Sequence, residues 1–209
     1  DSDDFWYKDK LKISSEYLKK YKLNGLCHSE HWLYETGEKE TRHYGLTGFS
    51  YDNLLKNGNN LSLSAVIVHA DILKGVKGFS EDIDYITAED YDLWLKLAKN
   101  NYKIKFIKHV MGTFRIHHRS ESSDVDKNIK AICSVIKNHC RDNDVHKNKI
   151  NIYIANAYII AGKIFQLNNL KNKSLSYYIK SIRLNPMRLK PYYMLFSLLF
   201  PIKLLKKVK

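Results

Sequence analysis

The first four residues of the chain carry three carboxylates, at Asp1, Asp3 and Asp4. Carboxylates this close together repel one another unless a cation lies between them, and Mg²⁺ and Mn²⁺ prefer oxygen ligands of this kind. Asp and Ser are also common in turns that cap a following helix. The opening segment therefore indicates either a metal site or an acidic turn that caps a helix expected over residues 7–22.

A second group of acidic residues lies in the segment Ala88–Trp94, which contains Glu89, Asp90 and Asp92. Thr87 and Asp90 have the three-residue spacing of a capping box that opens a helix over 88–99. A carboxylate in the first turn of a helix is stabilised as an anion by the helix dipole, which predicts a lowered pKa for Asp90. Asp92 is expected on the solvent-facing side of this helix.

A third segment, Phe114–Ser120, contains Arg115, His117, His118 and Arg119. A neutral imidazole can bind a metal ion, although a single His is more often an ordinary, partly buried side chain. The two arginines could contact phosphate or form structural salt bridges. His118 is not expected to take part in a site.

Together, in this order, the three segments resemble the family 2 glycosyltransferases of the GT-A fold. In that family a strand ends in a D-x-D-type metal motif, an E-D pair opens a helix below the acceptor site, and a following R-I-H supplies a further metal contact. The resemblance covers residues 1–122, including Phe5-Trp6 and Lys10-Leu11 after the acidic segment and Leu61–Ser80 before the E-D pair. Because the family normally has a nucleotide-binding half before the D-x-D motif, we expect the chain to be the back part of a longer enzyme.

The resemblance implies a metal-dependent, inverting glycosyltransferase. Such an enzyme moves a sugar from a nucleotide-sugar donor, with a UDP-sugar as the first expectation, to a glycan or a lipid-linked acceptor in bacterial surface polysaccharide synthesis. The implied cofactor is Mg²⁺ or Mn²⁺, held by Asp3, Asp4 and His117, with Asp3 as a direct ligand. Asp1 and Asp3 would contact the donor, and Asp1 would reach its ribose.

The resemblance also implies that Asp90 takes the proton of the acceptor hydroxyl and that Glu89 orients the acceptor or the base. The acceptor oxygen would attack the anomeric carbon from the face opposite the diphosphate. The alternative is a non-catalytic helical adaptor whose α/β part is a decayed transferase. Metal binding separates the two hypotheses.

Alternating apolar strands and amphipathic helices in the first 120 residues predict an α/β fold. We expect a partial GT-A-like sheet with covering helices over residues 1–122 and an all-helical region over 123–209. The strands are predicted at 26–34, at 65–68 as a strand buried on both faces, at 104–107 and at 113–117. Gly75 and Gly78 indicate a loop, and Trp6 and Trp94 are predicted in the core.

The all-helical region is predicted to contain helices at 150–167, 173–184 and 190–207. Ala157, Gly162, Tyr178 and Leu184-Asn185-Pro186 resemble one tetratricopeptide-like helical hairpin. A single hairpin of this kind cannot bury its own faces. We therefore expect it to pack on the catalytic part or on the last helix.

The net charge of +13 is concentrated at one end of the chain. Residues 1–144 contain 22 acidic and 22 basic residues, whereas residues 145–209 contain 13 Lys or Arg and no acidic residue. Nucleic acid is not an expected partner because no recognisable binding motif accompanies this charge. The remaining interpretations are an anionic membrane surface and a solvated helical face.

Residues 188–209 combine basic residues with an apolar stretch from Tyr192 to Leu205, which is interrupted by Pro201 and Lys203. This stretch of 14 residues is shorter than the ~20 needed to cross a bilayer. It could anchor the protein peripherally, or its apolar face could pack on the hairpin. Three cysteines without a C-x-x-C motif indicate reduced thiols, so we expect a cytoplasmic protein that can bind the inner face of the cell membrane.

Overall fold

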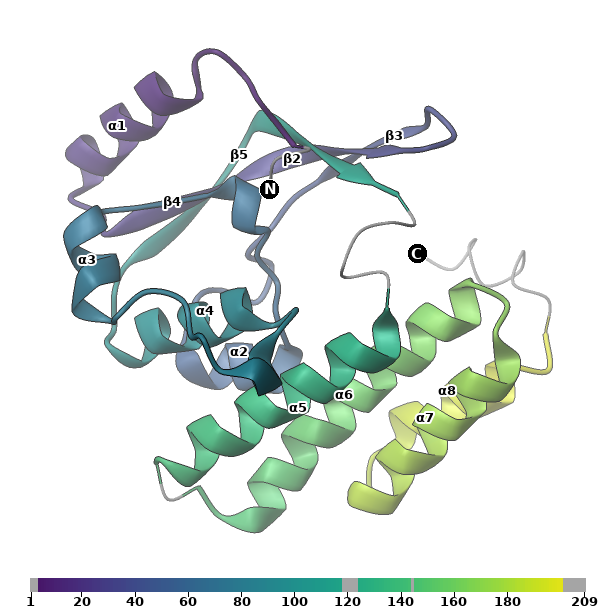
Figure 1. Cartoon of the computed structure of the whole chain (residues 1–209). Helices are drawn as coiled ribbons and strands as arrows, with labels where there is room; N and C mark the ends of the chain where they lie inside the picture. The colour runs from purple at the N-terminus through teal and green to yellow at the C-terminus, as the bar shows by residue number, and fades with distance from the viewer. Residues whose placement is uncertain (1–3, 118–123, 144, 201–209) are drawn as a thin grey trace. The chain divides into compact units, whose positions relative to one another are not determined.

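The computed structural model describes residues 4–117, 124–143 and 145–200. These residues form two compact units, which are described separately (Figure 1). The sheet unit comprises the described residues of Asp1–Leu55, Asn59–Glu81 and Glu89–Ser123. The helical unit comprises the described residues of Lys56–Gly58, Asp82–Ala88 and Asp124–Lys209.

The sheet unit is built on a mixed five-stranded sheet. Its strand order is β1 (Phe5–Trp6), β5 (Ile104–Ile116), β2 (Gly25–Tyr34) and β3 (Lys39–Arg42), and β4 (Val66–Val68) pairs with the first residues of β2. β2 and β5 run parallel at the centre, and the other pairs are antiparallel. The α/β class predicted from the sequence is confirmed.

Four helices belong wholly or mainly to the sheet unit: α1 (Lys10–Tyr21), α2 (Tyr51–Asn57), α3 (Ala70–Gly75) and α4 (Glu89–Lys99). A 3-10 turn, η1 (Leu63–Ala65), leads into β4. α4 contributes a nearly continuous buried surface because its apolar residues recur at helical spacing. The buried apolar residues of α4 are Tyr91, Leu93, Trp94, Leu95, Leu97 and Ala98.

A second apolar cluster lies beneath α1. Leu18 of α1 packs with Leu26 of β2 and with Ile107 and Met111 of β5. Each of these four side chains is at most 9% exposed. This cluster fixes α1 against the two central strands, so the chain segment that precedes α1 is held beside the sheet as well.

The helical unit contains η2 (Ile83–Tyr85), α5 (Val125–Arg141), α6 (Lys147–Leu167), α7 (Lys171–Leu184) and α8 (Leu189–Ser197). α6 and α7 form a helical hairpin, and α5 and α8 pack on it. By length and composition alone, α6 could cross a membrane. However, 56% of its most apolar stretch is buried inside the protein, as in a core helix.

Gly162 of α6 allows the two helices of the hairpin to approach closely. A Cβ atom at position 162 would lie 2.4 Å from a ring carbon of Tyr178 in α7. The hydroxyl of Ser174 donates a hydrogen bond to the carbonyl of Gly162 (2.8 Å), so the contact is polar as well as close. Any larger residue at position 162 would therefore push α7 away from α6.

Several elements differ from the sequence-based expectations. β5 is one strand of 13 residues rather than two extended stretches, because it pairs with β2 through two register shifts. β4 is half-buried rather than buried on both faces, since it pairs with β2 alone at the side also used by β3. The loop expected around Gly75 contains α3.

The two tryptophans of the motifs occupy different environments. Trp94 is 2% exposed, as predicted. The prediction that Trp6 is in the core is wrong, since its side chain is 56% exposed. Trp6 lies on a two-residue strand, and the ammonium of Lys10 is 3.8 Å from the centre of its ring. A cation on one ring face can stabilise an exposed indole without burying it.

Candidate functional site

Asp4 connects three segments of the sheet unit. One carboxylate oxygen accepts a hydrogen bond from the backbone N–H of Arg115 (3.0 Å), and the other accepts one from the hydroxyl of Ser64 (2.5 Å). Asp4 does not cap α1, which begins at Lys10 and is preceded by Asp9 at the cap position. Since each carboxylate oxygen offers two lone pairs, Asp4 keeps one on each oxygen for a cation.

Lys10 fixes the position of Ser64, which in turn binds Asp4. Lys10 is 1% exposed, and its ammonium donates a 2.5 Å hydrogen bond to the backbone carbonyl of Ser64. Burial lowers the pKa of Lys10 to about 8, against the opposing effects of the nearby Glu30, Cys27 and Asp4. Ser64 is thus fixed through its carbonyl by Lys10, while its hydroxyl fixes Asp4.

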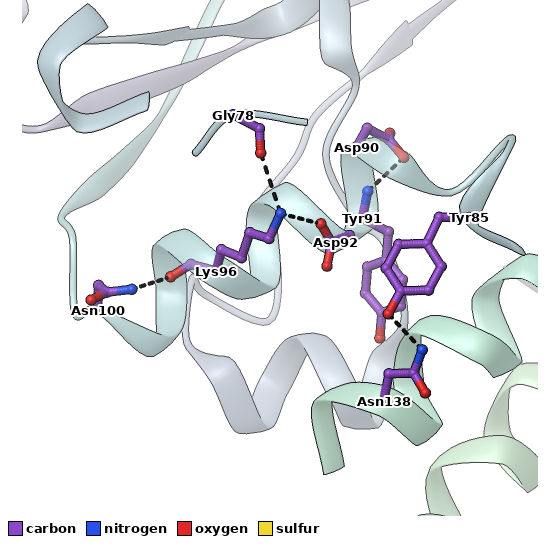
Figure 2. Close-up of polar contacts among 8 residues, drawn as sticks. All are labelled: Gly78, Tyr85, Asp90, Tyr91, Asp92, Lys96, Asn100 and Asn138. Carbon is purple, nitrogen blue, oxygen red and sulfur yellow. Dashed lines mark hydrogen bonds and ion pairs between the residues drawn. The ribbon is translucent and has the colours of Figure 1, made fainter. Parts of the chain in front are cut away.

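Asp90 lies in the first turn of α4. Its carboxylate accepts hydrogen bonds from the side-chain amide of Asn59 (2.8 Å) and from the backbone N–H of Tyr91 (2.6 Å, Figure 2). Burial raises the pKa of Asp90 to about 6, with a smaller contribution from the negative charge of Glu89, although both hydrogen bonds act in the opposite direction. The expectation of a lowered pKa is therefore wrong, because desolvation outweighs the stabilisation at the helix N-terminus.

Thr87 does not act as the cap of α4. The helix begins at Glu89, and Thr87 has a φ of +80°, whereas a capping residue has extended backbone. Left-handed backbone is strained for a β-branched residue, and such strain is concentrated at functional sites. The capping-box interpretation is wrong for these reasons, and the carboxylate of Asp90 binds Asn59 and Tyr91 as described.

Two acidic neighbours of Asp90 differ in their surroundings. Asp92 is 2% exposed and forms a 2.7 Å ion pair with Lys96, which also donates to the carbonyl of Gly78 (3.3 Å, Figure 2). The expectation that Asp92 faces solvent is therefore wrong, because Lys96 lies one turn further on the same side of α4 and pairs with it.

Glu89 Oε2 is buried and has no hydrogen-bond partner among the described residues. Most buried polar atoms in folded proteins have a hydrogen-bond partner, so this oxygen is one that could accept a hydrogen bond from a ligand.

The segment from Asn59 to Ser64 contacts two of the carboxylates singled out in the sequence. Asn59 at its start binds Asp90, and Ser64 at its end binds Asp4. Five residue steps of extended chain span at most about 18 Å. The structure therefore places Asp4 and Asp90 in one region of the sheet unit, although 86 positions separate them in the sequence.

Two residues of this region, Asn59 and Ser64, were not identified from the sequence, and Lys10 was noted only as part of the segment that resembles the family. The run Asn57-Gly58-Asn59-Asn60 indicates a turn, and nothing in its composition shows that one amide reaches Asp90. The pairing of Lys10 with Ser64 joins positions 54 residues apart, so no local pattern could reveal it.

His117 directly follows β5 and is half-buried. It lies two residues after Arg115, whose backbone N–H binds Asp4. His117 is therefore close to Asp4 along the end of β5.

Asp1, Asp3, His118 and Arg119 lie outside the described residues. Among residues 4–117, 124–143 and 145–200, no three His, Cys, Asp or Glu side chains form a group that could hold a metal ion.

Replacing Asn59 by Ala is expected to raise the pKa of Asp90 above its value of about 6. The amide of Asn59 stabilises the carboxylate anion, and loss of a hydrogen bond to a charged group shifts a pKa by about 1 unit. The shift can be measured by titrating the side-chain carboxyl carbon with ¹³C NMR. Asn100→Ala is the control, since its amide binds the carbonyl of Lys96 at the other end of α4. An unchanged pKa in Asn59→Ala would contradict the contact.

Comparison with known proteins does not assign the chain to a family. No family of known proteins matches the chain, and no curated protein does. The resemblance to family 2 glycosyltransferases therefore remains a prediction from the sequence. What the chain does has to be argued from the arrangement of the site residues.

Proposed function

We propose that the chain is part of a metal-dependent, inverting glycosyltransferase with a GT-A-like sheet. The observation that carries the proposal is the segment Asn59–Ser64, which holds Asp90 at one end and Asp4 at the other. Glycosyl transfer from a nucleotide donor needs a base for the acceptor and a cation for the departing diphosphate near each other. A common segment that supports both residues meets this requirement.

Asp90 is proposed as the general base. A base works best when its pKa lies near the operating pH, and the raised pKa of about 6 leaves most of the carboxyl ionised at neutral pH. Asn59 and the N–H of Tyr91 fix the direction of the carboxylate. Glu89 is proposed as the partner that orients the acceptor, since its buried Oε2 has a lone pair to offer to a sugar hydroxyl.

The proposed cation site combines Asp3, Asp4 and His117, and Asp1 is proposed to contact the donor. Asp4 fits this role because Ser64 and Arg115 orient its carboxylate while one lone pair on each oxygen stays available. Mg²⁺ or Mn²⁺ would neutralise charge on the diphosphate leaving group. The donor is proposed to be a UDP-sugar, and the acceptor a glycan or a lipid-linked sugar at the cytoplasmic face of the membrane.

Asp3→Ala and His117→Ala are each expected to weaken Mn²⁺ binding by roughly 10-fold or more, because each removes one ligand from the site. The measurement is calorimetric titration of the full-length protein with Mn²⁺, in the presence and in the absence of a UDP-sugar. Asp9→Ala and His109→Ala are matched controls, since both residues are exposed and lie outside the site.

The outcomes separate the two hypotheses for the chain. Mn²⁺ binding that is lost in both site variants and kept in both controls supports the transferase. A wild-type protein that binds neither Mn²⁺ nor a nucleotide sugar contradicts it and favours the decayed, non-catalytic adaptor. Unchanged Mn²⁺ affinity in His117→Ala would assign that residue a structural role.

A further inference from the structure

α8 exposes large apolar side chains along one face. Residues 189, 193, 196 and 200 follow one another at helical spacing and thus lie on one side of the helix and its last turn. Their exposed fractions are 80% for Leu189, 64% for Tyr193, 59% for Phe196 and 43% for Phe200. The rings of Phe196 and Phe200 contact each other edge to face at 5.3 Å. A contiguous exposed apolar patch of this kind marks an interaction site.

The opposite face of α8 holds the helix on the hairpin. Pro191 and Ser197 are its buried residues, and the hydroxyl of Ser197 accepts a 3.0 Å hydrogen bond from the side chain of Gln166 in α6. The same hydroxyl donates to the carbonyl of Met194 (2.6 Å). α8 therefore packs on the hairpin through its small residues and leaves its aromatic residues outside the contact.

Several basic side chains lie near the start of α8. The pKa of Lys190 is lowered, first by partial burial and then by the positive charges of Arg188 and Lys163. These effects show that the three cations lie near one another, beside Leu189. The apolar patch is therefore bordered by three cations, and residues 145–200 supply no acidic side chain to pair with them.

We propose that the exposed face of α8, together with Lys163 and Lys190, binds the surface of an anionic lipid bilayer, with Tyr193 and Phe196 inserted among the lipid headgroups. Aromatic residues flanked by cations favour the boundary between headgroups and acyl chains. Nucleic acid would pair with the cations but would leave Leu189 and Phe200 in water. This inference does not depend on the proposed transferase activity.

The apolar part of the proposal is tested with the double variant Tyr193→Ser, Phe196→Ser. The wild-type chain should co-sediment with vesicles of phosphatidylcholine and phosphatidylglycerol, and much less with phosphatidylcholine alone. The double variant should bind the anionic vesicles at least roughly 10-fold more weakly, because the apolar side chains no longer leave water. The control is Ile83→Ser, since Ile83 is 79% exposed in the helical unit but lies outside α8.

The charge part is tested with Lys163→Gln, Lys190→Gln. Two cations near an anionic surface contribute enough for a loss of about 30-fold. Lys147→Gln, Lys149→Gln is the matched control, because Lys147 lies about 24 Å from Lys163 along α6, beyond the screening length at physiological salt. Circular dichroism checks that every variant keeps its helices.

Three results would overturn the proposal. The first is equal vesicle binding by the α8 double variant and the wild type. The second is an equal loss in the Lys147, Lys149 control and in the Lys163, Lys190 variant. The third is binding to single-stranded RNA of mixed sequence but not to anionic vesicles, which would identify a polyanion site. Anionic vesicle binding that is reduced in both site variants and unchanged in both controls supports it.

Discussion

Asp90→Asn is expected to lower the turnover of sugar transfer by roughly 10²-fold or more while the affinity for the donor stays nearly unchanged. Asn keeps the shape of Asp and can still accept the hydrogen bond from the N–H of Tyr91, but it cannot take a proton from the acceptor. The measurement is steady-state kinetics of the protein as its gene encodes it, together with calorimetric titration of the nucleotide sugar.

The same substitution should stabilise the fold at neutral and alkaline pH. The pKa of Asp90 is raised from 3.8 to about 6 on folding, so the folded protein binds this proton more tightly than the unfolded chain does. The carboxyl therefore lowers the free energy of unfolding above about pH 6, by about 1–3 kcal/mol, and has no such effect below about pH 4. Asp90→Asn should unfold several degrees higher than the wild type at about pH 8, and the difference should disappear at about pH 4.

Asp92→Asn separates this effect from general damage to α4. Asp92 is acidic and buried, but it is paired with Lys96 rather than with the site. Its loss should lower the unfolding temperature because it leaves Lys96 without its anionic partner, and it should leave the turnover of the folded protein close to that of the wild type. Near-normal turnover in Asp90→Asn, or unfolding of that variant, would show that Asp90 is structural.

Tyr178→Ala is expected to lower the free energy of unfolding by about 3–5 kcal/mol, as for other buried aromatic residues. Tyr178 is 0% exposed and its ring fills the space left by Gly162. Its hydroxyl donates to Gln166 (2.8 Å), and Gln166 in turn donates to Ser197 of α8 (3.0 Å). Tyr178 and Gln166 together connect three helices, so the removal of Tyr178 leaves a cavity and takes one hydrogen-bond partner from the buried Gln166.

Urea unfolding followed by circular dichroism measures this loss. Tyr178→Phe should cost less, about 1–3 kcal/mol, since the ring stays and only the hydrogen bond to Gln166 is lost. Tyr192→Ala is the control, because Tyr192 is 43% exposed and its hydroxyl binds only the carbonyl of Pro186 at the surface. If Tyr178→Ala and Tyr192→Ala unfold at the same urea concentration, Tyr178 does not hold the helices together.

The sequence was sufficient for the fold class and for the central elements. β2 and α4 were predicted close to their observed bounds, whereas β5 was predicted as two separate stretches. The sequence was insufficient for side chains whose burial depends on contacts with residues far along the chain. Trp6 was predicted in the core, yet it lies on an edge strand that pairs with β5, and its side chain is 56% exposed.

In the candidate site, too, the residue types could be predicted from the sequence but their environments could not. Asp4, Glu89 and Asp90 could be selected from the sequence because their segments resemble motifs of family 2 glycosyltransferases. The pKa of Asp90 could not, since it depends on how much water the fold removes from the carboxylate. Nor could the backbone of Thr87, whose left-handed conformation has no signature in a β-branched residue. Burial and strain depend on the whole structure, whereas motifs are local.

The burial of Lys10 makes this residue a chemical probe of motion. Burial lowers the pKa of Lys10 to about 8, and in an open state this cause is removed, so the amine then reacts with an acylating reagent like an exposed lysine. Because Lys10 is 1% exposed, with its ammonium against the ring of Trp6 and bonded to Ser64, the reagent can reach it only when these groups move apart. The exposed Lys12 on the same helix reports the rate of an unhindered amine. The ratio of the two acylation rates therefore gives the fraction of time for which this part of the protein is open.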